Sequence, residues 1–352
     1  MEPGVYRHIS NDAYHSGAGD SKSGLDLIRK SPALLRAVKT GLRERKSTKA
    51  QMTGTSIHAM VLEPELVARS YAAPFVAPDG TLATVEHLKT ALTDAGVAFK
   101  QATNKTGLEE LARQHLPQAQ LYTDERAAYD LANKGKVVIE SDEWSRLENM
   151  LSAIRAHPAA MKLLSAPGES ELSAYWQQPV IYPATGEHLK NADGTPAYIL
   201  MRARPDYWCY DGRIVDLKST SPGGASPEEF ARSINNWRYY VQHPMYLRGA
   251  SEALKAMRGD DSFAKFKAPR AFVFVVVETD ACVVDGVAMG VAVYVLGPES
   301  VALGELEMRE DIATLHACQQ SGHYPGYSER IEPIELPAYA FTRAIARMGA
   351  TT

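Results

Sequence analysis

The sequence is poor in cysteine and has no long apolar run, and each absence excludes a class of protein. Its 352 residues include only three cysteines, Cys209, Cys282 and Cys318, which lie far apart and form no CxxC pair. This argues against a disulfide framework and a cysteine-built zinc site, and it favours a reducing compartment. Because no stretch of about 18 apolar residues occurs, we expect no membrane span and a cytoplasmic protein. The polar N-terminus lacks the apolar core of a signal peptide.

Motifs for several common chemistries are missing as well. The chain has no GxxxxGK[ST] phosphate loop, no HExxH and no GxSxG, so it lacks the signatures of P-loop ATPases, zincins and α/β-hydrolases. Gly17-Ala18-Gly19 lacks the third glycine and the preceding strand of a dinucleotide fingerprint. The formal net charge of -4 excludes a uniformly basic coat, although it is compatible with a local basic surface.

The length suggests two domains, or one large domain that carries an insertion. We expect the main domain over residues 1–78 and 141–352, with a helical insert over residues 79–140. Residues 1–16 look irregular. A helix is expected to begin after Ser21 or Ser23, and a second one to cover Thr53 to about Leu62. The insert predicts two helices, and a short strand is expected near Tyr71–Val76.

The centre of the sequence has β character, with helices on either side. An amphipathic helix is expected over Ser141–Leu164, interrupted at His157-Pro158, and another begins at Ser226-Pro227 and continues past Trp237 to Val241. The final helix is expected over about Pro298–Gln320. The predicted strands are Ser173–Ile181, Tyr198–Tyr210, Arg213–Lys218, Ala271–Glu278 and Val287–Leu296. This order indicates an α/β (α+β) fold, in which helices flank a mixed sheet.

One hairpin is expected to bring two carboxylates and an ammonium group together. Asp211-Gly212 is a strong hairpin signal between two of these strands. Asp206 and Asp216 lie at nearly equal distances from this turn, so antiparallel pairing makes them neighbours. Asp216 and Lys218 differ by two positions and therefore project from the same face of one strand.

Carboxylates and a lysine in this arrangement are suited to metal-assisted phosphoryl transfer. Carboxylate oxygens suit Mg²⁺ or Mn²⁺, which can activate a bound water and stabilise a phosphoryl transition state. The lysine can orient or deprotonate that water, or neutralise charge on the phosphate. The alternative interpretation is a surface ladder of Asp and Lys. Against it, the apolar neighbours Ile214, Val215 and Leu217 indicate a half-buried strand, where unpaired charges are costly.

Asp206 with Asp216-x-Lys218 resembles the PD-(D/E)xK nuclease signature, and the wider chain resembles the RecE (exonuclease VIII) branch of that superfamily. The resemblance extends over most of the chain and rests on the order and spacing of short motifs. These motifs are Ile9-Ser10-Asn11-Asp12-x-Tyr14-His15, Ser21-Lys22-Ser23-Gly24-Leu25, Gly54-Thr55-x-x-His58, Glu171-x-Ser173, Arg204-Pro205-Asp206, Asp216-x-Lys218, Tyr239-x-x-Gln242-x-x-x-Tyr246 and Tyr324-Pro325-Gly326-Tyr327.

The resemblance implies a restriction-endonuclease-like fold and a bacterial or phage-encoded enzyme. It implies a Mg²⁺-dependent exonuclease, with Mn²⁺ as a substitute, that degrades double-stranded DNA from its ends in the 5′-to-3′ direction. Such enzymes leave a 3′ single strand for a partner annealing protein of the RecT type, and relatives form homo-oligomeric rings around the duplex.

The resemblance also adds site residues to Asp206, Asp216 and Lys218. His58 matches the G-x-x-x-H pattern of these nucleases and is implied at the metal site, as a ligand or behind one, although a lone histidine on an apolar helix is more often a core residue. Glu171 matches an additional acidic ligand, with its neighbour Glu169 as a competitor. Glu63 precedes a proline and is interpreted as a helix-end residue.

A second group of residues is implied in DNA contact. Tyr239, Gln242 and Tyr246 match a motif that lines the active site and touches the DNA backbone. The alternative interpretation is a polar helix face with Tyr246 in the core. A helix start favours phosphate, so a 5′-phosphate site is plausible there, although N-capping explains the serines equally well. The residues of this second site are Ser21, Lys22, Ser23 and Arg29.

Residues Thr84 to His115 of the insert resemble helix–extended-loop–helix modules of the SAP and HeH kind, which often bind nucleic acid. Lys89, Lys100 and Lys105 would then contact phosphates without reading bases. The match is short, and two-helix patterns of this kind arise easily by chance.

Two alternatives to the exonuclease stay open. One is an endonuclease or an end-trimming nuclease on the same fold. The other is a DNA-binding subunit without catalysis, against which the intact Asp206, Asp216 and Lys218 speak.

Overall fold

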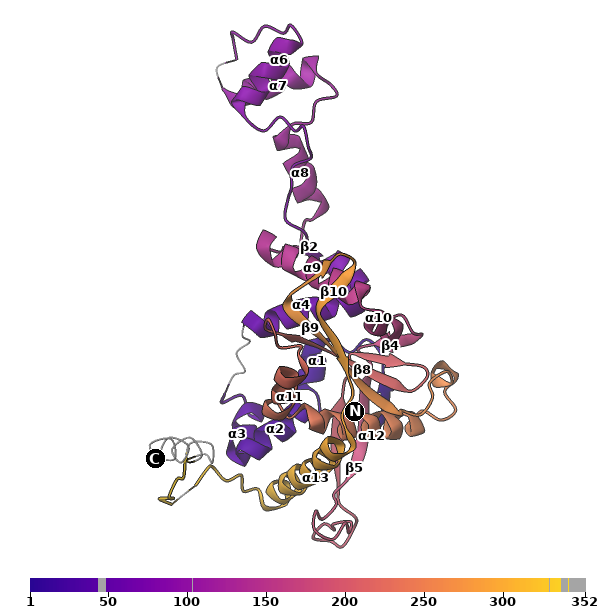
Figure 1. The fold of residues 1–352 in the computed structure, drawn as a ribbon. Coiled ribbons are helices and arrows are strands. Elements are labelled where there is room, and N and C mark those ends of the chain that lie inside the picture. Colours follow the sequence, from indigo (N-terminus) through magenta and orange to yellow (C-terminus); the bar gives the residue numbers. More distant parts are fainter. Residues whose placement is uncertain (44–48, 103, 329, 337–340, 342–352) are drawn as a thin grey trace, which may run out of the picture.

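A five-stranded mixed sheet forms the centre of the protein in a computed structural model that describes residues 1–43, 49–102, 104–328, 330–336 and 341 (Figure 1). β8 and β9 run parallel, whereas the other neighbours are antiparallel. Buried Phe272 to Val277 make β9 the core strand that the apolar run predicted. In spatial order the strands are β10 (Val287–Tyr294), β9 (Ala271–Val284), β8 (Arg213–Thr220), β7 (Tyr207–Cys209) and β4 (Gly168–Ser170).

Helices cover both faces of this sheet. Side chains alternate along β8, so its apolar residues pack in a core on each face. Val215 and Leu217 pack on one side against helices α4 (Lys49–Leu62), α9 (Ser141–Ala156) and α10 (Pro158–Leu164). Ile214 packs on the other side, against α11 (Pro227–Asn236) and α12 (Tyr239–Ala256). The expected mixed sheet flanked by helices is confirmed.

A second, three-stranded sheet lies against the far side of α12. It consists of β1 (Gly4–Tyr6), β5 (Ser173–Pro179) and β6 (Tyr198–Ala203), all antiparallel. A shared core, which includes Trp176, Met245 and Ile312, joins this sheet to three helices. These helices are α2 (Lys22–Lys30), α3 (Pro32–Lys39) and α13 (Pro298–Ser321). Within the ranges described, no helix is both long and apolar enough to cross a bilayer.

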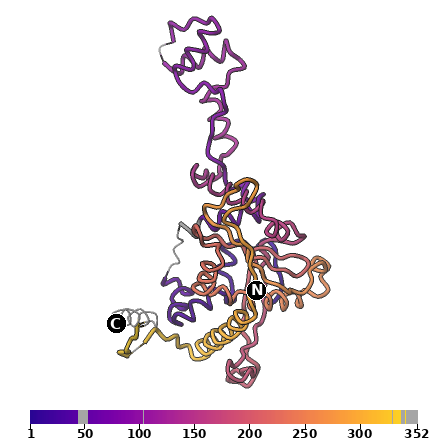
Figure 2. Tube along the Cα trace, in the orientation of Figure 1, coloured from indigo at the N-terminus to yellow at the C-terminus, as the bar shows by residue number. Residues whose placement is uncertain are grey.

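The insert rises from the body on a narrow stem (Figure 1). After α5 (Pro64–Ser70), strand β2 (Tyr71–Ala72) pairs in parallel with β3 (Val137–Val138), so the chain leaves and returns at the same place, as Figure 2 shows. Between the strands lie α6 (Val85–Asp94), α7 (Lys105–His115) and α8 (Tyr122–Ala132). The first two helices share a small core of their own, around Leu88, Leu92 and Leu108.

Several expected elements differ from the structure. Residues 1–16 are not irregular, since they form β1 and the helix α1 (Asn11–Ser16), whose first turn is capped by the Ser10 hydroxyl. The strand expected near Tyr71–Val76 has only two residues. The insert contains a third helix, α8, which the sequence did not indicate. No residue of α8 is buried and Leu131 is exposed, so α8 lacks a clear apolar face.

One predicted strand and one predicted helix are each interrupted once in the structure. The strand expected over Tyr198–Tyr210 is interrupted before β7, so β6 and β7 belong to different sheets. The helix expected from Ser226 to Val241 ends at Asn236, because Arg238 adopts a left-handed conformation with a φ of 53°. Pro244, in contrast, does not break α12. It deprives the Tyr240 carbonyl of a helical partner, and Gly304 of α13 approaches that carbonyl so closely that a Cβ would lie 2.2 Å from it.

Candidate active site

The hairpin between β7 and β8 brings Asp206 to Asp216. Tyr207 pairs with Val215 and Trp208 with Ile214, so continuing this register places Asp206 opposite Asp216. The Leu217 backbone N–H donates to Asp206 Oδ2 at 2.6 Å, which fixes this carboxylate across the two strands. The neighbourhood that the hairpin signal predicted is therefore present.

Asp216 and Lys218 project from β8 toward α12. The Asp216 carboxylate is only 2% exposed and forms an ion pair with the Lys218 ammonium, while Gln242 Nε2 of α12 donates to Asp216 Oδ1 at 3.1 Å. Burial lowers the pKa of Lys218, but the charges of Asp216 and Asp206 outweigh this and leave the pKa raised. Lys218 is therefore a protonated group, suited to orienting water and to offsetting charge on a phosphate rather than to removing a proton.

His58 and Glu171 reach Asp206 from two other elements. His58, on α4, lies with its Nδ1 at 3.6 Å from Asp206 Oδ2. Glu171 follows β4 with a φ of 55°, and its backbone N–H donates to the Asp206 carbonyl at 3.1 Å. Burial, with the charge of Asp206 second, raises the pKa of Glu171 to about 8. Burial also raises the pKa of Asp206 to about 6, although the charge of His58 opposes the shift.

The structure separates Glu171 from its competitor Glu169. Glu169 accepts two hydrogen bonds from the Arg7 guanidinium, at 2.5 and 2.9 Å, and a further one from Tyr210. Arg7 is the largest cause that holds the pKa of Glu169 below its usual value. Glu169 is engaged in this ion pair, whereas Glu171 is the carboxylate whose pKa responds to the charges of Asp206 and Asp216. Glu63, interpreted above as a helix-end residue, precedes α5, and its charge also contributes to raising the pKa of Glu171.

The donor set fits a hard divalent cation in its chemistry, although it is not a closed cage. Across the described ranges, no three His, Cys, Asp or Glu side chains are arranged to enclose an ion. The buried Asp216 Oδ2 accepts no hydrogen bond of ordinary geometry, and Asp206 and Glu171 are crowded carboxylates whose pKa values are raised. Residues that would hold a cation are Asp206, Asp216 and Glu171, with His58 beside them.

An open cavity of about 330 Å³ lies beside these residues. Its wall includes six of the seven residues implied in DNA contact, and Glu171 opens onto it. Tyr246 is half-buried, lines this cavity and packs edge-on against Phe272, while its contact with DNA stays a prediction. The lining residues are Asn11, Tyr14, His15, Ser21, Lys22, Ser23, Asp26, Glu171, Arg204, Tyr239, Gln242 and Tyr246.

Arg204 is a residue to which the sequence assigned no separate task. Its guanidinium donates to Ser173 Oγ at 2.9 Å, to Asn11 Oδ1 at 2.8 Å and to the Ile9 carbonyl at 2.9 Å, and it lies 4.0 Å above the Tyr14 ring. Arg204 therefore ties α1 to β5 along one wall of the cavity. Its position directly before Pro205-Asp206 was the available signal.

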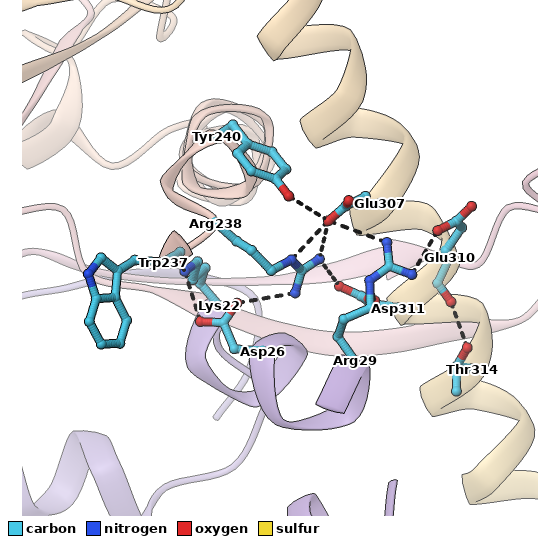
Figure 3. Close-up of polar contacts among 10 residues, drawn as sticks. All are labelled: Lys22, Asp26, Arg29, Trp237, Arg238, Tyr240, Glu307, Glu310, Asp311 and Thr314. Atoms are coloured by element: carbon cyan, nitrogen blue, oxygen red, sulfur yellow. Dashed lines mark hydrogen bonds and ion pairs between the residues drawn. The ribbon is translucent and has the colours of Figure 1, made fainter. Parts of the chain in front are cut away.

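The structure does not place Arg29 at the cavity, in contrast to the expected phosphate site. Arg29 instead forms ion pairs with Glu307, Glu310 and Asp311 of α13. Lys22 does line the cavity, but its ammonium donates to Asp26 Oδ2 at 2.8 Å and to the Trp237 carbonyl at 2.5 Å (Figure 3). The helix start expected to bind phosphate thus has its cations largely engaged within the protein.

Arg238 is the centre of this network of ion pairs, which we call the Arg238 cluster (Asp26, Arg29, Arg238, Glu307 and Asp311). Its guanidinium donates to Glu307 at 2.8 Å, to Asp311 at 2.6 Å and to Asp26 at 3.2 Å (Figure 3). Three elements thereby meet at the break between α11 and α12. A left-handed arginine is strained, so these contacts hold a conformation that the local sequence disfavours.

Two of the lysines proposed for the insert lie on α6 and α7, which form the part of the insert farthest from the body (Figure 1). Lys105 is 3.7 Å from Glu109 and lies over the Tyr122 ring, while Lys89 is on α6 and Lys100 follows it. The resemblance to a nucleic-acid module stays a prediction.

The chain was compared with known proteins. A family model described as a PDDEXK-like domain of unknown function (DUF3799) matches residues 21–337. A solved structure from Eubacterium rectale, described as a "Putative exonuclease", is similar with 11% sequence identity and a TM-score of 0.44, over 96% of this chain and 98% of that chain. Among curated proteins, no match is found.

Proposed function

Because the chain belongs to this family of PDDEXK-like domains, we propose that it is a metal-dependent exonuclease that degrades double-stranded DNA from its ends. Family membership supports a nuclease, and PDDEXK nucleases generally use divalent metal ions. The observation that carries the proposal is the meeting of Asp206, Asp216 and Lys218 midway along β8, next to an open cavity. Direction, 5′-to-3′, and the preference for Mg²⁺ are supported by the resemblance to the RecE branch.

The residues of the site divide the work of phosphodiester hydrolysis. A bound Mg²⁺ would supply an activated water and offset charge on the phosphate. Asp206, Asp216 and Glu171 would hold it, and His58 orients Asp206. Lys218 places its ammonium where charge develops on the attacked phosphate. Gln242 holds Asp216 in place, and Tyr239 shields Lys218, whose Nζ lies 4.7 Å from the centre of its ring.

The wider role that we propose is in DNA recombination, as the supplier of a 3′ single strand. The strand would pass to a single-strand annealing protein of the RecT type, and the nuclease would act as a homo-oligomeric ring. The motifs quoted above, through their resemblance to the RecE branch, support these proposals.

Digestion of a labelled linear duplex tests the proposal directly. We expect progressive loss of the strand that carries a 5′-phosphate, with Mg²⁺ and not with EDTA. A covalently closed circle is expected to stay intact, since an exonuclease needs an end. Nicking of the circle would favour an endonuclease, and Mg²⁺-dependent binding without any product would favour a non-catalytic subunit.

The raised pKa values of Glu171 and Asp206 predict how metal and pH affect stability. Both groups have folded-state pKa values above their ordinary values, so their ionised forms destabilise the metal-free fold. This cost is absent at low pH and is complete above about pH 8, at which Glu171 is ionised. We therefore expect Glu171→Gln to raise the free energy of unfolding of the metal-free protein near pH 8 by about 1–2 kcal/mol, which corresponds to a melting temperature higher by a few degrees. Near pH 5 the melting temperature should change little.

Thermal unfolding with EDTA and with Mn²⁺ at both pH values measures the effect. Mn²⁺ is expected to stabilise the wild-type protein more at pH 8 than at pH 5, and to stabilise Glu171→Gln less. Glu169→Gln is the matched control, since Glu169 has a lowered pKa and an arginine partner. If Mn²⁺ stabilised both variants as much as it stabilises the wild-type protein, the assignment of Glu171 to the metal would be wrong.

A further inference from the structure

Trp237 is a large aromatic side chain that the fold leaves in solvent. It is 61% exposed, whereas Trp176 and Trp208 are completely buried in the cores. It follows the last turn of α11 and directly precedes the left-handed Arg238. Single exposed apolar side chains are common, so exposure alone assigns no role. The surroundings of Trp237 are what distinguish it.

The backbone of Trp237 is held on both sides. Its carbonyl accepts a hydrogen bond from the Lys22 ammonium, and the next residue is fixed by the Arg238 cluster. In Figure 3 the indole points away from these polar contacts, which hold only its main chain. An aromatic ring on a backbone fixed in this way loses little conformational entropy when it binds a ligand.

The main chain of Trp237 lies next to the candidate active site, with the indole outside the cavity lining. Lys22, which holds the Trp237 carbonyl, lines the cavity, and so does Tyr239, two residues further along the chain. The Tyr239 ring has the Lys22 ammonium at 5.6 Å and the Lys218 ammonium at 4.7 Å from its centre. The backbone of Trp237 is thus attached to two residues of the cavity wall, one of which also contacts Lys218.

The charges around Trp237 are compensated, so this part of the rim is poorly suited to binding phosphate. Lys22 is paired with Asp26, and Arg238 and Arg29 are paired with carboxylates of α13. What the rim offers a nucleic acid is the flat face of the indole. Stacking of bases on aromatic side chains tolerates any sequence, as an enzyme that degrades DNA progressively requires.

We propose that Trp237 is a stacking platform for a nucleobase of the DNA strand that enters the cavity. The inference rests on the proposed nuclease function and adds a binding site to it. The platform holds the strand by a base, while the metal site and Lys218 act on its backbone.

Binding of a single-stranded oligonucleotide in EDTA tests the platform without cleavage. We expect Trp237→Ala to bind a fluorescein-labelled oligonucleotide roughly tenfold more weakly than the wild-type protein, and Trp237→Phe to recover part of the loss. An oligonucleotide with abasic sites at its 5′ end should bind the wild-type protein and Trp237→Ala alike. Tyr182→Ala, which removes an exposed aromatic ring of the β5–β6 connection, is the control and should bind like the wild-type protein.

Tryptophan fluorescence gives a second reading. Binding of the normal oligonucleotide should quench the wild-type emission, and Trp237→Phe should lose this quenching. Equal affinity of Trp237→Ala and wild-type protein, or a change in oligomeric state without a change in DNA affinity, would overturn the platform while leaving the nuclease intact. A wild-type protein that neither binds nor cleaves DNA would instead contradict the proposed function.

Discussion

Lys218→Ala is expected to lower DNA cleavage by about 10³-fold while the protein stays folded. The ammonium of Lys218 forms an ion pair with Asp216, and the charges of Asp216 and Asp206 keep Lys218 protonated. Without it, charge on the attacked phosphate loses its protein partner. The substitution also leaves Asp216 with Gln242 alone, so some loss of stability accompanies the loss of activity.

Initial rates on a linear duplex, together with circular dichroism, separate these two effects. Asp216→Ala is expected to be as inactive as Lys218→Ala, because it removes a metal-holding carboxylate. Lys255→Ala is the matched control, since Lys255 is an exposed lysine of α12 that pairs only with Glu252. Cleavage at the wild-type rate by a folded Lys218→Ala protein would refute the mechanism.

Arg238→Ala is expected to destabilise the protein by about 3–5 kcal/mol, because it removes the nearest cation of the buried Asp311 carboxylate. Asp311 is 2% exposed, and it would keep only the contact with Arg29 at 3.3 Å. Burial raises the pKa of Asp311 to about 6, even with Arg238 present. Because a raised folded-state pKa costs stability only where the group is ionised, the damage should be largest above about pH 7 and smaller near pH 5.

Urea unfolding at the two pH values measures this dependence. Arg232→Ala, which removes an exposed ion pair with Glu229 of the same helix, should cost less than about 1 kcal/mol at either pH. Arg238→Gly should be less damaging than Arg238→Ala, since glycine adopts the left-handed conformation without strain. An Arg238→Ala loss that is equal at both pH values would show that Asp311 is not the group left unpaired.

The hairpin of β7 and β8 could be predicted because its determinants are local. The turn at Asp211-Gly212 fixes the register, and strand alternation puts Asp216 and Lys218 on one face. The number of residues between each aspartate and the turn therefore determines that Asp206 and Asp216 lie opposite each other. The apolar run of β9 is equally direct, since a strand covered on both faces has few polar residues.

The break at Arg238 and the place of Arg29 could not be predicted in this way. Serine, proline and two acids begin a helix before Phe230, and nothing nearby in the sequence indicates where it ends. The end is set by Asp26 of α2 and by Glu307 and Asp311 of α13, which contact Arg238. All three are far from Arg238 along the chain. Glu307 and Asp311 also form ion pairs with Arg29. Reasoning from the start of α2 alone therefore put Arg29 at the cavity rather than against α13.

The two-residue ladder of β2 and β3 has an evolutionary consequence. Because the chain enters and leaves the insert at paired neighbours, the body requires of the inserted segment only that its two ends lie side by side. The segment has its own small core and shares little with the body, so segments of other lengths and sequences are compatible with the same attachment. Gain, loss or exchange of this module is therefore compatible with an unchanged hairpin between β7 and β8.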